Sequence, residues 1–295
     1  MRFSAARHGL VLFGFWIIVS FSSSLHAVDY GQQTRNWIID RLQKEIGENQ
    51  PDLNTISSLL YPLTSSSHQY RHPAVRAVLE PTAKYLTTLK PEKLECGQLA
   101  DLKLSAGFLA QAEIVIDTSE AEGKLGDCNL AGSLFDSVNA LIFYCRYSGE
   151  AHQKKLPGAL DAVERAQLPN GSFAWEKGRP WFYLTSHAVV ALYYCEGDSQ
   201  RLHKGQQRLL ELLPRFYRMG FIDGLAESMI FLRWMAIPIP GYGTYLGYLR
   251  SRVLSDGGIC FQDRPGCRAN WHATSLLLEL ENLENFRSPV TFSQD

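Results

Sequence analysis

The sequence predicts an all-α protein, specifically an α/α toroid of helical hairpins, and three observations support this prediction. Apolar residues recur at helical spacing through most of the chain after Tyr30, and strand patterns are nearly absent. Nearly uncharged helices alternate with amphipathic ones, which indicates an inner and an outer layer. Gly-containing turns precede two of the uncharged helices. We expect about eleven helices joined by short loops.

Residues 1–27 are predicted to be a signal peptide. Basic Arg2 and Arg7 precede an apolar run that is shorter than the roughly 20 residues needed to span a bilayer, and small residues lead to Ala27. Residues 28–295 are expected to form a single toroid domain, because no Gly-rich or Pro-rich linker divides them. We therefore expect a secreted or periplasmic protein with no stable membrane span after cleavage.

The charge balance argues against a nucleic acid partner. The chain has 29 basic and 30 acidic residues and a formal net charge of −1. A nucleic-acid-binding protein would need a basic face, which this composition does not indicate.

The six cysteines are an even number in an exported chain, which predicts disulfide bonds. Cys260 and Cys267 are the predicted pair, because the Asp-Arg-Pro-Gly turn between them brings their ends together. For Cys145 and Cys195, buried free thiols remain an alternative.

The helices are expected in the following order. Amphipathic segments cover 34–46, 52–63, 73–89 and 97–116, and Asp52 is a cap signal for the second. The nearly uncharged segments are 133–145, 182–195, 222–235 and 270–282, whereas 198–218 carries a charged face. A helix that is apolar on most sides must be enclosed by other helices, so the uncharged segments are assigned to the inner layer.

A repeat links the uncharged segments. Ser137, Ser186, Ser228 and Ser275 take equivalent places in them and are separated by 49, 42 and 47 residues. One period corresponds to two helices and two loops. An open α-solenoid, whose repeats measure about 40–47 residues, is the alternative fold.

The turns repeat as well, since "NGSF" at 170–173 and "DGGI" at 256–259 each precede an inner helix. Asn-Gly and Asp-Gly favour tight reversals because glycine accepts positive φ. The aromatic residue that follows such a turn is expected to pack under the next helix and to fix its entry angle. Thr185 or Ser186 is expected to provide the N-terminal hydroxyl of its helix.

These turns carry a resemblance. "QLPNGSF" resembles the Q-x-x-x-G-x-W repeat of the terpenoid cyclase and protein prenyltransferase superfamily, with Phe173 in place of Trp, and "SDGGICF" resembles a turn of prenyltransferase β-type subunits. The resemblance covers Gln167 to Glu281 and implies that inner-helix starts surround a central cavity. Ten residues lie at these starts: Asp136, Asn139, Trp181, Tyr183, His187, Asp223, Glu227, Asn270, Trp271 and His272.

Prenyltransferase β-type subunits have a zinc site built from Asp-x-Cys and a later His, so the same resemblance makes zinc a candidate ligand of this chain. Asp223 and His272 match two ligands, but Leu225 stands in the place of Cys, so Glu227 or His187 would have to complete the set. We therefore expect no cofactor, with zinc as the alternative. The Asp-rich motifs of terpene cyclases, DxDD and DDxxD, do not occur in the chain.

A glycan ligand is the other possibility that the sequence raises. Polysaccharide lyases of α/α-toroid form use His, Asn, Tyr and Arg, and here Arg268, Asn270 and His272 are close in sequence, with Tyr183 expected across the cavity. The alternative is that Arg268 and Asn270 only flank the start of a helix.

The sequence thus predicts a protein that binds or acts on an apolar or glycan ligand in a central cavity. His272, His187 and Asp223 are the candidate catalytic residues. The candidate ligand-binding residues are Trp181, Tyr183, Glu227, Arg268, Asn270 and Trp271. The alternative is a non-catalytic helical-repeat scaffold with a protein partner.

Overall fold

The computed structural model describes residues 29–128, 134–147, 157–174 and 181–286. These residues form 13 α-helices and one short 3-10 helix, and they contain isolated β-bridges but no strand. The all-α prediction is confirmed. The predicted number of helices was too low, partly because the short helices α3 (Ser67–Tyr70) and α6 (Ser119–Gly126) have too few residues for a periodic pattern.

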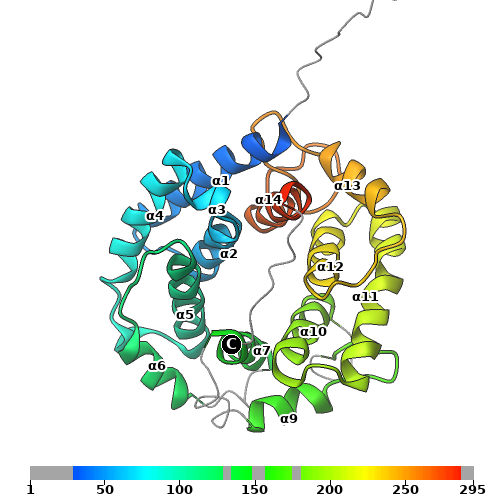
Figure 1. Ribbon diagram of the computed structural model, residues 1–295, viewed down its shortest axis with the longest axis horizontal. Helices are drawn as coiled ribbons and strands as arrows, with labels where there is room; N and C mark the ends of the chain where they lie inside the picture. The colour runs from blue at the N-terminus through cyan, green and yellow to red at the C-terminus, as the bar shows by residue number, and fades with distance from the viewer. Residues whose placement is uncertain (1–28, 129–133, 148–156, 175–180, 287–295) are drawn as a thin grey trace, which may run out of the picture.

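Six helices form a closed inner ring (Figure 1). Each contacts the next around the ring, and the last contacts the first. In chain order they are α2 (Leu53–Thr64), α5 (Cys96–Gln111), α7 (Leu134–Tyr147), α10 (Phe182–Glu196), α12 (Ile222–Trp234) and α14 (Trp271–Phe286).

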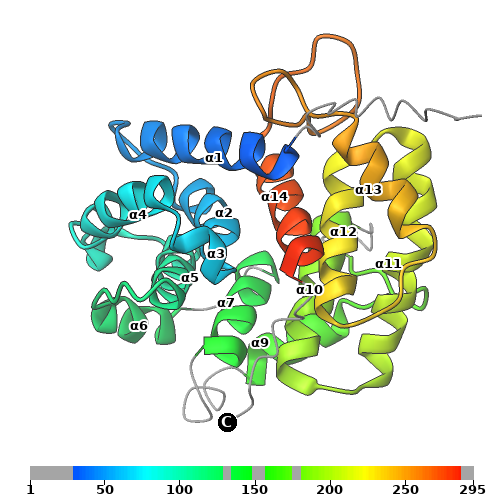
Figure 2. The ribbon, with the colours of Figure 1, turned by 45° about the horizontal axis from the view of Figure 1, so that its top comes forward.

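The outer layer surrounds this ring (Figures 1 and 2). It consists mainly of α1 (Tyr30–Ile46), α4 (Pro73–Leu86), α6, α9 (Pro157–Arg165), α11 (Gln200–Met219) and α13 (Tyr242–Arg250). The amphipathic α11 shows why the layers separate as the sequence predicts: its Leu209, Leu213 and Phe216 are buried, and its Lys204 is exposed.

The four repeat serines mark equivalent positions in the inner layer. Ser137, Ser186, Ser228 and Ser275 lie on α7, α10, α12 and α14, and all four are buried. The helical-hairpin period predicted from their spacing therefore corresponds to successive inner helices.

Two glycine turns fix inner helices to outer ones. Gly171 and Gly257 have φ values of +81° and +90°. A Cβ atom on Gly171 would lie 2.2 Å from the carbonyl oxygen of Lys204 in α11, and one on Gly257 would lie 2.4 Å from that of Gln33 in α1. Only glycine fits both the backbone conformation and the close approach. The second turn joins the C-terminal part of the chain to the N-terminal helix.

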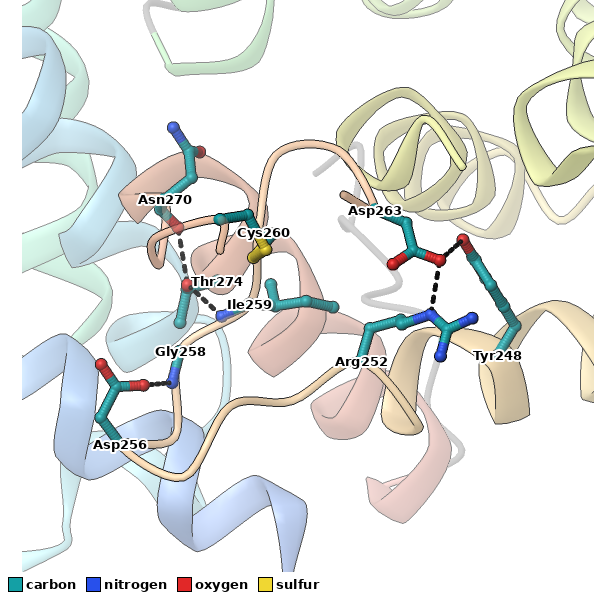
Figure 3. The surroundings of a disulfide bond; sticks show 10 residues. Tyr248, Arg252, Asp256, Gly258, Ile259, Cys260, Asp263, Asn270 and Thr274 are labelled. Atoms are coloured by element: carbon teal, nitrogen blue, oxygen red, sulfur yellow. Dashed lines mark hydrogen bonds and ion pairs between the residues drawn. A yellow bond between two sulfur atoms is a disulfide. The ribbon is translucent and has the colours of Figure 1, made fainter. Parts of the chain in front are cut away.

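A threonine one turn inside α10 and another one turn inside α14 hold these two turns in place. Thr185 Oγ1 accepts a hydrogen bond from the Phe173 N–H at 2.9 Å, and Thr274 Oγ1 accepts one from the Ile259 N–H at 3.0 Å. Figure 3 shows the second of these contacts beside the disulfide loop. Phe173 and Ile259 are fully buried, as expected for residues packed under a helix.

The expected capping role of Thr185 or Ser186 is wrong. Helix α10 already begins at Phe182, and its N-cap Trp181 makes no side-chain capping bond. The Thr185 hydroxyl therefore connects the turn to the helix and does not cap the helix.

Three disulfides link the chain: Cys96–Cys128, Cys145–Cys195 and Cys260–Cys267. The predicted Cys260–Cys267 pair is confirmed. The alternative of free thiols for Cys145 and Cys195 is wrong, because these residues end equivalent inner helices that are neighbours in the ring. The bonds that close 50 and 32 residues restrict the unfolded chain more than the one that closes 7.

A buried polar network joins the last inner helix to the first. Glu279 of α14 accepts hydrogen bonds from Tyr61 and Ser65, both at 2.6 Å. Asn282 donates to the carbonyl oxygen of Pro62 at 2.9 Å and accepts from Gln69 at 2.7 Å. Burial raises the pKa of Glu279, and the hydrogen bonds from Ser65 and Tyr61 oppose this rise. The ring is thus closed by polar as well as apolar contacts.

The predicted signal peptide, residues 1–27, lies outside the described residues. In the part of the chain that the structure describes, no helix combines the length and the apolar character needed to cross a membrane.

Candidate functional site

A cavity of about 140 Å³ lies at the centre of the ring. All six inner helices contribute to its wall, and the surface that faces the cavity is mainly apolar. Its polar wall includes His187 and His272, as the sequence predicted for inner-helix starts. The apolar and aromatic residues of the wall are Tyr61, Leu104, Phe108, Ile142, Val190, Phe231, Trp234 and Leu276.

A hydrogen-bonded acid–base cluster lies beside the cavity. His272 Nδ1 lies 2.8 Å from Oδ1 of Asp223, and the hydroxyl of Tyr183 donates to Oδ2 of the same carboxylate. Asp223 is fully buried, whereas 22% of the His272 side chain is exposed. This pairing leaves the other ring nitrogen of His272, Nε2, available to a ligand or to Glu227.

Glu227 lies one helical turn after Asp223 on α12 and is also fully buried. Ser186 of α10 donates to its Oε1, and His187 Nε2 lies 3.6 Å from the same oxygen. Its Oε2 lies 3.8 Å from His272 Nε2 and makes no hydrogen bond among the described residues. Burial raises the pKa of Glu227 to about 8, so this carboxyl retains a proton near neutral pH.

The two histidines have opposite pKa shifts. Burial lowers the pKa of His187 to about 3, with the charge of His272 acting in the same direction. Burial also opposes the charge on His272, but the charge and hydrogen bond of Asp223 outweigh it and raise the pKa of His272 to about 9. Near neutral pH, His272 is therefore a cation and His187 is neutral. The Nδ1 atom of His187 lies 3.2 Å from Asn139 Oδ1.

Stability is expected to fall as the pH rises through the range in which Glu227 and His272 lose protons. Both pKa values are higher in the folded protein than in the unfolded chain, so the stabilisation is complete below the unfolded values and is lost as pH rises through about 8 and 9. Below about pH 6.5 the lowered pKa of His187 acts in the opposite direction, so the decrease in Tm is expected between about pH 6.5 and 9, and Glu227→Gln should make it shallower. Thermal unfolding followed by circular dichroism across this range measures the effect.

Glu120→Gln is the matched control, since Glu120 is exposed on α6. It should leave the pH dependence of Tm unchanged. If Glu227→Gln gave the wild-type profile, the raised pKa of Glu227 would be refuted.

Asp223, Glu227 and His272 are also the residues that could hold a metal ion, because each offers a ligand atom within 4.8 Å of the others. Asp223 already accepts from Tyr183 and pairs with His272 Nδ1, and Glu227 Oε1 accepts from Ser186. A cation there would share the carboxylate oxygens with these hydrogen bonds, and the three residues would leave one position of a tetrahedral set without a protein ligand.

The remaining predicted residues lie outside the cavity wall. Trp181 and Trp271 are half-buried at the starts of α10 and α14, where their rings contact Tyr183 and His272 at centroid distances of 5.9 and 5.4 Å. Arg268 and Asn270 line a separate depression at the Cys260–Cys267 loop. Asn270 caps α14 by accepting from the Ala273 N–H at 2.9 Å. The side chain of Asp136 is outside the described residues.

Several wall residues were not predicted from the sequence, chief among them Arg146, Tyr61 and Trp234. A signal for Arg146 was present, because it follows Asn139 by seven residues and so lies on the same helix face. For Tyr61 and Trp234 no motif gave such a signal.

Comparisons of the chain with protein-family models, curated proteins and solved structures find no match. The site geometry is therefore the basis for the functional proposal.

Proposed function

We propose that this protein, after export, binds a small and mainly apolar ligand in the central cavity, and that His272 donates a hydrogen bond or a proton to the ligand. The observation that carries the proposal is the apolar cavity at the centre of the ring, whose wall includes a histidine paired with a buried carboxylate. Concave, mainly apolar pockets with a few polar groups are typical ligand sites.

Three features support His272 as the donor. Its Nδ1 is paired with Asp223, which fixes the orientation of the ring. The raised pKa of about 9 keeps the ring charged near neutral pH. Protonated Glu227 is 3.8 Å from Nε2, so the two groups must approach by about 0.6 Å or more before Glu227 can return a proton that His272 has transferred.

An apolar ligand is favoured over a glycan. The predicted glycan residues Arg268 and Asn270 lie at a different depression, and Trp181 and Trp271 are absent from the described cavity wall. A sugar would also need hydrogen-bonding partners for each of its hydroxyl groups, whereas the wall surface is mainly apolar. The suggested relationship to the terpenoid cyclase and prenyltransferase superfamily is part of this proposal, supported by the ring and the two glycine turns.

Calorimetric titration with cyclohexanone and with methylcyclohexane tests the proposal, and Trp234 in the cavity wall gives a second, fluorescence signal. Wild-type protein should bind the ketone about tenfold or more tightly, because a hydrogen bond from a charged donor contributes about 1.5–3 kcal/mol. His272→Leu should bind both compounds with similar affinity.

Ser251→Ala, on the exposed surface after α13, is the control and should bind both compounds as wild type does. If neither compound bound to folded wild-type protein, the cavity would not be a ligand site, and the non-catalytic scaffold would become the better description.

A further inference from the structure

The Cys260–Cys267 loop, which lies between α13 and α14, carries a polar depression with two positive charges. Figure 2 shows this part of the chain extending beyond the ends of the inner helices. The depression has a volume of about 590 Å³, and its wall includes Arg264 and Arg268. Gln262 and Asn270 add side chains with amide groups. Both arginines are exposed, and the described wall contains no acidic residue.

The acidic residue between the two cysteines of the loop is already paired. Asp263 Oδ2 lies 2.8 Å from Nε of Arg252 and accepts a hydrogen bond from the Tyr248 hydroxyl at 3.2 Å (Figure 3). The side chains of Arg264 and Arg268, in contrast, make no ion pair or hydrogen bond with any residue that the structure describes. Their charges are therefore available to a partner outside the described chain.

The loop is held in place, so its depression has a defined shape. The Cys260–Cys267 disulfide closes it, and Cys260 forms an isolated β-bridge with Ala269. The Asp263 N–H donates to the Gly220 carbonyl oxygen at 2.8 Å, which fixes the loop to the end of α11. Groups that are positioned before binding lose less conformational freedom when a partner arrives.

Two exposed apolar side chains lie beside this charged depression. Phe261 contributes to its wall and is 39% exposed, and Met219, at the end of α11, is 54% exposed. Met219 directly precedes Gly220, whose carbonyl oxygen contacts the loop. Among the described residues the other large exposed hydrophobic side chain is Val115, between α5 and α6 on the opposite side of the ring (Figure 1). Exposed apolar side chains that gather in one place mark an interaction surface.

We infer that the Cys260–Cys267 loop and the adjoining end of α11 dock on the surface of an anionic phospholipid membrane. Guanidinium groups pair well with phosphate oxygens, so a lipid headgroup suits the depression that Arg264 and Arg268 line. Phe261 and Met219 would then lie in the boundary layer between the headgroups and the acyl chains. This docking goes beyond the proposed function and does not depend on the central cavity.

The exposed apolar side chains favour a membrane over a soluble acidic polymer. An acidic polysaccharide could pair with the two arginines, but its hydrated chain offers little apolar surface to cover Phe261 and Met219. Arg218, in the last turn of α11, adds a further exposed positive charge directly before Met219. Basic and large apolar side chains in one place are typical of surfaces that bind anionic lipids.

Co-sedimentation with lipid vesicles tests the inference on the chain with its three disulfides intact. Wild type should bind vesicles of equal parts phosphatidylcholine and phosphatidylglycerol about tenfold or more tightly than vesicles of phosphatidylcholine alone, and added salt should weaken this binding. Arg264→Gln combined with Arg268→Gln should reduce the affinity for the anionic vesicles about tenfold or more. Met219→Ser should reduce it about threefold or more, because apolar contact is lost.

Arg165→Gln, exposed on α9, and Val115→Ser are the matched controls and should bind the vesicles as wild type does. Circular dichroism checks that each variant is folded. Equal binding of wild type to both kinds of vesicle, or equal losses in the loop variants and the controls, would overturn the inference. Binding of soluble polygalacturonate without binding of either vesicle would also overturn it, in favour of an acidic glycan.

Discussion

Gly171→Ala is expected to lower the free energy of unfolding by about 5 kcal/mol or more, which is close to the whole stability of many domains. The φ of +81° alone costs an alanine about 1–2 kcal/mol. The new Cβ would also lie 2.2 Å from the Lys204 carbonyl oxygen. That oxygen belongs to the backbone of α11, so the turn or the whole helix would have to shift.

Gly241→Ala is the matched control, since Gly241 is left-handed with a φ of +74° and the added Cβ would come no closer than 3.8 Å to the Tyr245 ring. This control should lower the free energy of unfolding by only about 1–2 kcal/mol. Urea denaturation of both variants and of wild type separates backbone strain from the steric contact. Equal losses in the two variants would show that the approach of the turn to α11 does not limit stability.

Glu279→Ala is expected to lower the free energy of unfolding by about 5 kcal/mol, through two effects. The substitution leaves a cavity in a fully buried part of α14. It also removes the acceptor of the Tyr61 and Ser65 hydroxyl groups. Each buried donor left without a partner costs about 1–3 kcal/mol.

Glu284→Ala on the same helix is the control, because its ion pair with Arg233 is half-exposed and 3.7 Å long. Such pairs contribute about 0–1 kcal/mol. Glu279→Gln keeps the side-chain volume but turns an amide donor toward the Tyr61 and Ser65 donors. Its loss in free energy of unfolding should therefore lie between those of Glu279→Ala and Glu284→Ala. Chemical denaturation of the three variants ranks them. A loss in Glu279→Ala no larger than in Glu284→Ala would mean that the polar network does not hold α14 to α2.

Much of the fold could be predicted because it depends on local patterns. The repeat serines are buried on four successive inner helices, and both Gly turns have the expected conformation. These features follow from helical periodicity and from the conformations open to glycine. The position of Thr185 was misjudged by one turn, because the start of α10 at Phe182 has no side-chain cap to mark it.

The site was predictable only where its residues lie at helix starts. His187, Asp223, Glu227 and His272 were found because each lies within the first turn or two of an inner helix. Arg146 and Glu279 lie near the other ends of α7 and α14, and each contacts a residue of a neighbouring helix in the ring, Tyr194 of α10 and Tyr61 of α2 respectively. Contacts of that kind depend on which helices become neighbours, which one sequence does not reveal.

The closed ring has a consequence for how the protein reaches its native state. The contact between Tyr61 and Glu279 joins residues 218 positions apart. During synthesis one side of α2 therefore stays uncovered until α14, the last inner helix, has been made. Folding of chains with such distant contacts is slow. In the meantime the uncovered sides of α2 and α12 expose apolar surface to which chaperones, or other copies of the chain, can bind.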